Sequence, residues 1–459
     1  MNKLSALVFA GALVAGALLM FSCSGSGNKI VFEGYDGNWT ATGNVEADNT
    51  VITLKGKEAT AILNKKFKNF HAEIVLQTVK GGKGFFCFHT DQLLKKGYRV
   101  AINNDRDDPV WWKMSGSILA VRNLTKSFVR DEQWFTLGVS VEENLISVSI
   151  DGNLVAEYAE PTETFRTPAN KEQLLADGLL AFTSSDEGEI RIKSVTVKKL
   201  DRTQAQTTDV DENQDDILKL HQEDFPVLDY HVHLKGGLTK EEAAALSRKT
   251  GINYALAPNC GIGFPITNDG EVLTFLDTMR TQPFILAMQA EGREWIETFS
   301  KSVRDEFDYV FTDALTFSDN KGRRTRLWIP EETWIDEEEM YMDIIVDRIC
   351  MVLNEPMDIY VNPCFLPDQM VGRYDQFWTE ERMNKFVNAL AKSGKALEIN
   401  NRYRIPNKAI IMKAKEAGVK FTFGTNNAAA ELGLMEYAIQ MKNECGITAT
   451  DMYKPKIKI

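Results

Sequence analysis

Histidine is scarce in this chain, with five residues in 459, and several other features are lacking. The six cysteines are scattered without a Cys-x-x-Cys spacing, which argues against a thiolate zinc cluster. The formal net charge is −12, which argues against nucleic acid as a partner. Beyond the N-terminal apolar stretch, no run is long enough to cross a bilayer. A chain of 459 residues, 44% of them hydrophobic, has enough material for two independent hydrophobic cores.

The N-terminus has the pattern of a secretory signal. A short basic segment, Met1–Lys3, precedes an apolar run from Leu4 to Phe21. The end of this run, Leu19–Cys23, resembles a bacterial lipobox, which implies that Cys23 becomes the lipid-bearing first residue of the mature chain. We therefore expect residues 1–22 to be a lipoprotein signal peptide and the protein to be lipid-anchored at the bacterial cell envelope. No acidic cluster follows Cys23, which favours the periplasmic face; plain secretion is the alternative.

Residues 29–200 alternate short strand-like segments with turn residues, which is typical of an all-β sandwich. The expected strands are Val51–Leu54, His71–Thr78, Tyr98–Ile102, Phe135–Val141, Leu145–Ile150, Leu154–Tyr158 and Ile190–Val197. Asp151–Asn153 predicts a hairpin turn between two of them. The polar stretch of residues 201–221 is predicted to be a linker.

This N-terminal domain resembles the 3-keto-disaccharide hydrolase domain family, a concanavalin-like jelly roll. The resemblance rests on Lys96–Val100, Ile102–Asp105, Ser115–Ile118, Asp131–Trp134, Ile150–Asn153, Gly178–Ala181 and Ile190–Lys193. It implies a carbohydrate ligand with contacts from Tyr98, Asn103 and Asp105. Where the family often has a histidine near the last strands, this chain has Thr183–Asp186.

Residues 222–459 alternate apolar strands with amphipathic helices, which predicts a parallel sheet with crossover helices, most simply a (β/α)7 TIM-like barrel. The expected strands are Val227–Leu234, Asn253–Pro258, Phe284–Ala290, Tyr309–Phe317, Asp358–Pro363, Ala396–Asn400 and Phe421–Gly424. The expected helices include Lys240–Thr250, Trp295–Glu306, Glu337–Leu353, Glu380–Ser393 and Asn407–Ala417. The chain therefore has two domains of different fold class.

Two of the five histidines, His231 and His233, lie one residue apart on the first expected barrel strand. Side chains at i and i+2 of a strand point to one face, so both imidazoles are aimed at one spot. Polar residues also follow the other strands, at the end where such barrels carry active sites: Asn259, Cys260, Glu291, Asp313, Asn362, Cys364, Glu398, Asn400, Thr425, Asn426 and Asn427. Buried polar groups cost free energy unless they are paired, so such a ring predicts a site. Two satisfied histidines beside a loop are the alternative.

A barrel that opens with His-x-His resembles the polymerase-and-histidinol-phosphatase (PHP) superfamily of metal-dependent phosphoesterases. The resemblance covers roughly residues 222–440 and rests on His231-Val232-His233, Glu291 and the strand Leu397–Asn400. The family's later histidines are missing, since Asn362 and Asn427 stand in their places, so the full trinuclear site cannot form.

The remaining set can still hold one ion. His231, His233 and Glu291 would bind one divalent metal, Zn, Mn or Fe, at the barrel mouth. Asp313 or Glu398 would act as general base. A barrel that has lost its metal and only binds is the alternative.

Further residues of the barrel domain are candidates for contact with substrate. Arg324 and Arg326 lie in a basic, aromatic loop with Trp328 and suit an acidic sugar or a phosphate. Lys235 follows His-x-His and can contact substrate or an enolate, and Asn400 and Asn426 are placed to bind substrate at strand ends.

Together these features predict a secreted carbohydrate-active hydrolase or lyase that cleaves a modified glycoside, most simply a 3-keto sugar, with one metal at the barrel mouth. A C3 ketone acidifies the C2 hydrogen, so a base can remove it while the aglycone leaves C1. Two alternatives stay open. One is a PHP-like metal-dependent phosphoesterase or hydrolase that acts through the barrel alone. The other is a non-catalytic carbohydrate-binding lipoprotein.

Overall fold

The structure is a computed structural model that describes residues 19–21, 39–47, 51–185, 187–200, 205–206, 208 and 210–458. Cys23 and nearly all of the expected signal peptide lie outside the described residues. The signal peptide and the lipid anchor therefore stay predictions. Within the described ranges, no helix has both the length and the apolar character that crossing a membrane requires.

The chain forms two compact units, each built from several stretches. Unit 1 consists of Met1–Asp105, Val129–Glu143 and Glu172–Ala205, and unit 2 of Arg106–Phe128, Asn144–Lys171 and Gln206–Ile459. Two segments that the sequence places in the sandwich, residues 106–128 and 144–171, therefore belong to the same unit as the barrel.

Unit 1 is a sandwich of antiparallel sheets, as the spacing of turns predicts. One sheet has the order β1-β2-β5-β12-β7-β8, with bounds Leu19–Phe21, Trp39–Thr42, Thr60–Phe67, Gly178–Ser184, Lys83–Thr90 and Tyr98–Asn103. The other has, within this unit, the order β9-β6-β13-β4-β3, with bounds Phe135–Glu142, Phe70–Val79, Glu189–Lys199, Ile52–Lys55 and Val45–Ala47. Alternate residues of β6 form its buried face: Phe70, Ala72, Ile74 and Leu76.

Unit 2 contains a closed barrel of seven parallel strands, which confirms the predicted (β/α)7 architecture. The strands are β14 Leu228–Val232, β15 Asn253–Leu256, β17 Ile285–Ala290, β18 Tyr309–Thr312, β21 Ile359–Tyr360, β22 Ala396–Asn400 and β23 Phe421–Gly424. The first strand, β14, pairs with β15 and with the last strand, β23, and the pairing of β15 with β17 closes the ring. A short strand, β16 (Asn259–Cys260), extends the edge beside β17.

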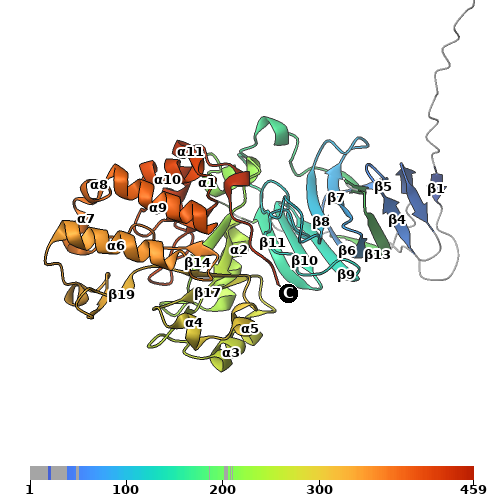
Figure 1. The fold of residues 1–459 in the computed structure, drawn as a ribbon. Coiled ribbons are helices and arrows are strands. Elements are labelled where there is room, and N and C mark those ends of the chain that lie inside the picture. Colours follow the sequence, from blue (N-terminus) through green and yellow to red (C-terminus); the bar gives the residue numbers. More distant parts are fainter. Residues whose placement is uncertain are drawn as a thin grey trace, which may run out of the picture. The chain divides into compact units, whose positions relative to one another are not determined.

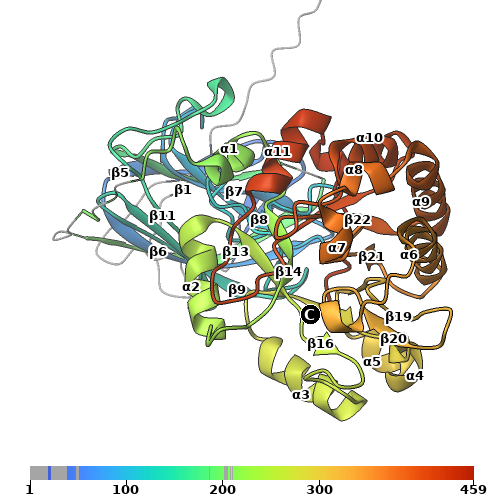
Figure 2. The ribbon, with the colours of Figure 1, turned by 90° about the vertical axis from the view of Figure 1, so that its left-hand side faces the viewer.

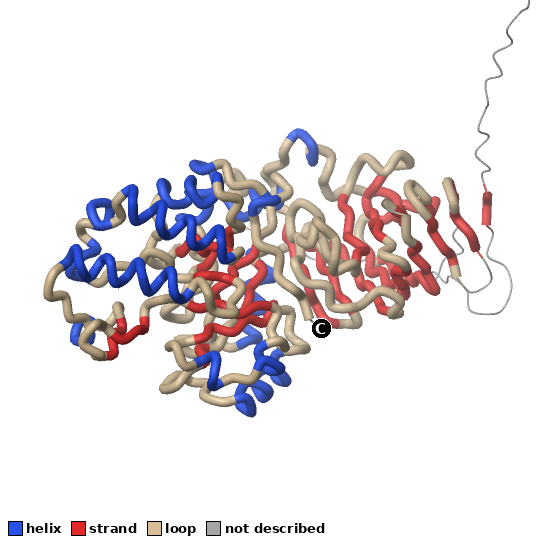
Figure 3. Tube along the Cα trace, in the orientation of Figure 1, coloured by secondary structure: helices blue, strands red, loops and turns tan. Residues whose placement is uncertain are grey.

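Helices surround the barrel strands (Figures 1–3). They are α1 Asp216–Gln222, α2 Lys240–Thr250, α3 Asp269–Met279, α4 Trp295–Thr298, α5 Lys301–Arg304, α6 Glu338–Val352, α7 Asp368–Val371, α8 Tyr374–Phe377, α9 Glu380–Ser393, α10 Lys408–Glu416 and α11 Glu436–Cys445. The expected helix 295–306 is divided, because Phe299 has extended backbone angles and Ser300 caps a new helix. Helix α1 occupies the end of the stretch predicted as a linker, because Leu218 and Leu220 are buried.

Unit 2 also contains two hairpins and three short 3₁₀ helices. The hairpins are β10 Leu145–Ile150 with β11 Asn153–Ala159, and β19 Thr316–Ser318 with β20 Arg324–Arg326. The 3₁₀ helices are η1 Pro168–Asn170, η2 Pro330–Glu332 and η3 Ala449–Asp451. The turn predicted at Asp151 is therefore observed.

The segment of residues 106–128 is attached to the amino-terminal ends of the barrel strands. Lys126 Nζ donates to the carbonyl oxygen of Phe284 at 2.7 Å, just before β17. The backbone N–H of Thr125 donates to Asn253 Oδ1 at 3.2 Å, at the start of β15. The carboxyl ends of the strands, where barrel enzymes carry their sites, lie at the other end of the barrel.

Candidate functional site at the barrel mouth

A cavity of about 450 Å³ lies at the carboxyl ends of the barrel strands, and we call it the barrel-mouth cavity. Loops from successive strand–helix units contribute its lining: Lys235, Asn259, Phe264, Pro265, Gln289, Glu291, Asp313, Leu315, Trp328, Asn362, Arg402, Tyr403, Asn426 and Ala428. The structure thus brings six of the predicted residues together in one lining: Lys235, Asn259, Glu291, Asp313, Asn362 and Asn426.

His231 is completely buried and contacts two side chains from other strands. Its Nδ1 lies 2.6 Å from Glu398 Oε1 on β22, and its Nε2 lies 3.2 Å from Gln289 Oε1 on β17. Because Gly424 has no side chain, β23 can pass close to this pair: a Cβ there would lie 2.0 Å from Glu398 Oε1. The buried His231–Glu398 pair therefore depends on a glycine.

His233 is held by Asn427 and by the backbone of the next strand. Asn427 Oδ1 accepts the backbone N–H of His233 at 2.8 Å, and Asn427 Nδ2 donates to the His233 carbonyl oxygen at 2.9 Å. His233 Nδ1 lies 2.7 Å from the carbonyl oxygen of Ala257, whereas its buried Nε2 has no hydrogen-bond partner among the described residues. Burial lowers the pKa of His233 well below 6.5, so the ring is neutral.

Asn362 joins the two sides of the site. Its Nδ2 donates to Asp313 Oδ2 at 2.8 Å, and its Oδ1 accepts from Asn400 Nδ2 at 3.0 Å and from Asn426 Nδ2 at 2.8 Å. Its backbone N–H donates to Glu398 Oε2 at 2.7 Å. Asn362 and Asn426 have positive φ angles, 46° and 45°, a conformation that concentrates at functional sites. The network therefore fixes the Asp313 and Glu398 carboxyls relative to each other.

Glu291 and Asp313 are two buried carboxyls that interact in the barrel-mouth cavity. Burial, and then the neighbouring Asp313, raise the pKa of Glu291 from 4.5 to about 8, although Asn259 Nδ2 donates to its Oε1 at 2.7 Å. Burial also raises the pKa of Asp313. A carboxyl that keeps its proton at neutral pH beside a second carboxyl is one arrangement that suits general acid–base catalysis.

Asp229 was not predicted as a site residue, but it ties β14 to β23. Its Oδ1 accepts the backbone N–H groups of Thr425 at 3.0 Å and His231 at 3.1 Å, and its Oδ2 accepts from Thr425 Oγ1 at 2.5 Å. Burial raises its pKa to about 6. Asp229 therefore sets the position of the backbone that carries His231.

The predicted metal ligands are not assembled around one point. No group of three or more His, Cys, Asp or Glu side chains is arranged to hold a metal ion in the described part of the chain. His231 Nε2 faces the Gln289 amide, and Glu291 is engaged by Asn259. In this arrangement the three residues do not form the predicted three-ligand set. The binding of a single Zn, Mn or Fe ion is a separate question and stays a prediction. Metal analysis of the purified protein beside a His231→Ala/His233→Ala variant tests it.

Three predicted sugar-binding residues belong to unit 1. Tyr98 is completely buried and stacks on Phe88, with ring centroids 5.7 Å apart. The buried Asn103 accepts the backbone N–H of Asp105 at 3.0 Å, and Asp105 forms an ion pair with Lys83 at 3.1 Å. Their contact with sugar stays a prediction.

The predicted arginine loop contributes an aromatic residue to the cavity. Arg326 Nε donates to Glu332 Oε2 at 2.6 Å, and Arg324 is exposed. Neither lines the barrel-mouth cavity, but Trp328 does. Substrate binding by these arginines stays a prediction.

Gln289, Arg402 and Tyr403 line the cavity, and the sequence did not single them out. Gln289 has a signal, as a polar residue in the otherwise apolar strand Ile285–Ala290. Arg402 and Tyr403 have none, because the path of their loop depends on two hydrogen bonds between the backbones of Asn400 and Ile405.

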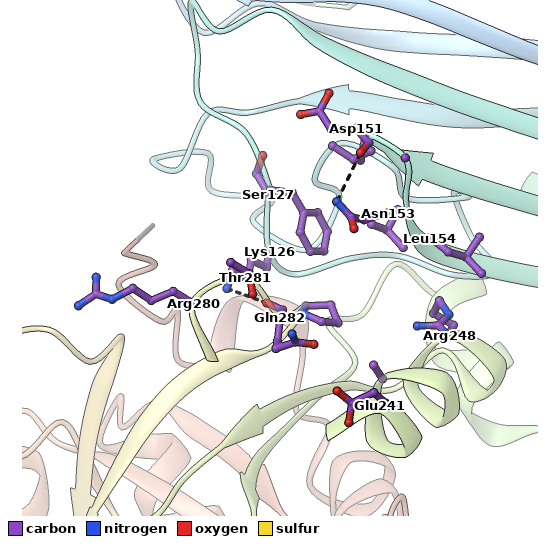
Figure 4. A pocket seen from close by; sticks show the side chains of 16 residues that line it. Lys126, Ser127, Asp151, Asn153, Leu154, Glu241, Arg248, Arg280, Thr281 and Gln282 are labelled. Atoms are coloured by element: carbon purple, nitrogen blue, oxygen red, sulfur yellow. Dashed lines mark hydrogen bonds between the residues drawn. The ribbon is translucent and has the colours of Figure 1, made fainter. Parts of the chain in front are cut away.

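Unit 2 has a second pocket, of about 680 Å³, near the start of β17 (Figure 4). The cationic side chains of its lining, Lys126, Arg248 and Arg280, are engaged within the protein. Arg248 pairs with Glu157 at 3.3 Å, Arg280 with Glu306 at 2.7 Å, and Lys126 with the Phe284 carbonyl. The two buried carboxyls with raised pKa values, Glu291 and Asp313, line the barrel-mouth cavity and not this pocket.

Residues 27–198 match the family described as the 3-keto-alpha-glucoside-1,2-lyase-like domain, which confirms the predicted resemblance of the N-terminal domain. No curated protein matches the chain.

Many solved structures resemble part of the chain, among them the following two. A putative glycosyl hydrolase from Parabacteroides distasonis is 17% identical, with a TM-score of 0.32; the match covers 35% of this chain and 84% of that protein. Carbohydrate-binding module CBM66 from Bacillus subtilis is 13% identical, with a TM-score of 0.27, covering 35% of this chain and 95% of the module.

Proposed function

We propose that this protein cleaves a keto-glycoside and that the barrel-mouth cavity is its catalytic site. The observation that carries the proposal is the buried pair Glu291 and Asp313, whose pKa values are both raised within one polar cavity. The description of the family matched by residues 27–198 supports a 3-keto-α-glucoside as the substrate class.

The two carboxyls suit a 1,2-elimination. Asp313, as a carboxylate, takes the C2 proton, which the C3 ketone acidifies. The C2–H electron pair forms the C1=C2 bond while the C1–O bond breaks, and protonated Glu291 gives its proton to the departing oxygen. Addition of water across C1=C2 then gives the hydrolysis product. The overall change is loss of an alcohol, followed by gain of water.

Negative charge develops on the C3 oxygen as the C2–H bond breaks. Tyr403 lines the same cavity, and burial raises its pKa, so its phenol stays protonated. It is therefore available as a hydrogen-bond donor to that oxygen, an interaction that strengthens as the transition state forms.

Two substrates with different leaving groups test these roles. We expect turnover of methyl and p-nitrophenyl 3-keto-α-glucosides, but not of the corresponding glucosides without the ketone or of p-nitrophenyl phosphate. Asp313→Asn should lower kcat/KM on both keto-glycosides by about 10²–10⁴. Glu291→Gln should lower it most on the methyl glycoside, whose leaving group needs a proton. The surface variant Asp347→Asn is the matched control. Cleavage that does not require the ketone, or no cleavage of either keto-glycoside, would contradict the proposal.

A further inference from the structure

Two cations, Lys235 and Arg402, line the barrel-mouth cavity. Lys235 follows β14 and is half-buried, whereas Arg402 lies in the loop after β22 and is exposed. Burial, and then the Arg402 charge, lower the pKa of Lys235, and the same two cations add to the lowering of the pKa of His233. The two positive charges are therefore close enough to repel each other.

Neither cation forms an ion pair with a carboxylate in the described part of the chain. Other arginines close to the mouth are paired: Arg293 with Glu355 at 2.8 Å and Arg326 with Glu332. Glu291 is the carboxyl that acts on Lys235 through space, without forming an ion pair with it. The positive charge of Lys235 and Arg402 is therefore not compensated by a paired carboxylate.

The backbone holds Lys235 in place. The N–H of Lys235 donates to the His233 carbonyl oxygen at 3.1 Å, and its own carbonyl accepts from Leu238 at 3.1 Å. Gly236, with φ of 64°, lets this turn pass so close to Ala430 that a Cβ would lie 2.8 Å from the Ala430 nitrogen.

The loop of Arg402 is held equally firmly. The neighbouring N–H of Tyr403 donates to Asn400 Oδ1 at 2.9 Å, and that of Asn401 to the Gly424 carbonyl at 2.8 Å. The Arg402 guanidinium lies 5.0 Å from the centre of the Tyr403 ring, which packs edge-on against Phe365. The fold thus keeps two like charges together, and a bound anion would relieve their repulsion.

We propose that Lys235 and Arg402 form a subsite for an anionic group, a carboxylate or a phosphate, carried by the glycoside that enters the barrel mouth. This inference rests on the proposed function for the glycoside itself. A guanidinium can bind such a group through two parallel hydrogen bonds, and an ammonium acts as a point charge beside it. Trp328 and Phe264, in the same cavity, offer apolar faces to the sugar ring.

Calorimetric binding of four probes tests the subsite: methyl α-D-glucoside, methyl α-D-glucuronide, glucose 6-phosphate and inorganic phosphate. We expect at least one anionic sugar to bind about tenfold or more tightly than the neutral glucoside. A preference for the glucuronide identifies an acidic sugar, and a preference for glucose 6-phosphate identifies a sugar phosphate. The advantage should shrink as salt increases, because the groups are partly exposed.

Lys235→Gln and Arg402→Gln should each reduce the anionic preference, and the double variant should abolish it while keeping the affinity for the neutral glucoside. Lys385→Gln and Arg373→Gln, which remove surface cations paired with Asp347 and Glu338, are the charge-matched controls. Because Arg402 is exposed, its variant tests the subsite even if Lys235→Gln folds poorly.

The outcomes separate the subsite from the proposed function. Equal binding of neutral and anionic sugars, or a preference that survives in the double variant, overturns the subsite and leaves glycoside cleavage standing. Binding of inorganic phosphate that the double variant loses, without binding of any sugar, overturns the proposal that a glycoside carries the anion. Turnover of the keto-glycosides decides the proposed function separately. Absence of binding by all four probes overturns the subsite.

Discussion

Replacing Glu291 by glutamine should change how the stability of the barrel depends on pH. The variant keeps the size of the side chain and an oxygen that can accept from Asn259 Nδ2, but it removes one titrating carboxyl. In the folded protein, burial first and Asp313 second raise the pKa of this carboxyl from 4.5 to about 8.

The sign follows from proton counts. Between pH 4.5 and about 8 the folded protein holds a proton on Glu291 that the unfolded chain lacks. Unfolding therefore releases a proton, and the free energy of unfolding falls by about 1.4 kcal/mol for each pH unit as the pH rises. The contribution of the Glu291 proton to the free energy of unfolding is fully present below pH 4.5 and is lost by about pH 8. From pH 5.5 to 7.5 the wild-type protein should lose about 3 kcal/mol of stability through Glu291. The Glu291→Gln variant should not show this loss.

Hydrogen exchange measures the pH dependence of stability in the barrel strand next to Glu291. Amides of β17, the strand that precedes Glu291, report opening of the barrel, and their exchange is corrected for the intrinsic rate at each pH. We expect the stability of the variant relative to wild type to increase by about 3 kcal/mol from pH 5.5 to 7.5. Identical pH slopes for the two proteins would refute the assignment of a raised pKa to Glu291.

Three further outcomes follow from the site. Gly424→Ala should displace the Glu398 carboxylate and so lower both kcat/KM and Tm. The control Gly372→Ala, whose Cβ would meet nothing within 4 Å, should leave both values unchanged. Equal melting temperatures for the two variants would contradict this. Asn362→Ala should cost about 3 kcal/mol in the same exchange measurement, since it removes three buried side-chain hydrogen bonds, one of them to a carboxyl. The exposed control Asn354→Ala should stay within about 0.5 kcal/mol, and a similar loss in both would argue against the network. Cleavage of the methyl keto-glycoside should decline above about pH 8, as Glu291 loses its proton, and activity that still rises at pH 9 would exclude Glu291 as the acid.

The barrel could be predicted from the sequence because each strand is a short apolar run that ends in polar residues. All seven strands lie within the expected segments, and Glu291 and Asp313 meet in one cavity because the carboxyl ends of parallel strands converge. The interior hydrogen bonds could not be predicted. Nothing in the local sequence indicates that Asn362 bridges Asp313, Asn400 and Asn426, since these contacts depend on strands far apart in the chain.

Two other features depended on long-range packing. Segment 106–128 belongs to unit 2, where Lys126 donates to the carbonyl oxygen of Phe284, a partner that lies more than 150 residues further along the chain. The place of Arg402 depends on the turn between Asn400 and Ile405, which no motif marks. The local sequence pattern therefore predicts where the barrel strands end. The positions of the loops that complete the cavity are known only from the structure.

The most direct test of the account is the fate of the C2 hydrogen of the substrate. A methyl 3-keto-α-glucoside carrying deuterium at C2 is hydrolysed in ordinary water, with a sample lacking enzyme to correct for spontaneous exchange. Removal of this hydrogen by Asp313 predicts that the sugar product has lost its deuterium at C2. A product that retains the deuterium, formed without a primary deuterium isotope effect on kcat/KM, would show that the C2–H bond does not break and would contradict cleavage by elimination at the barrel mouth.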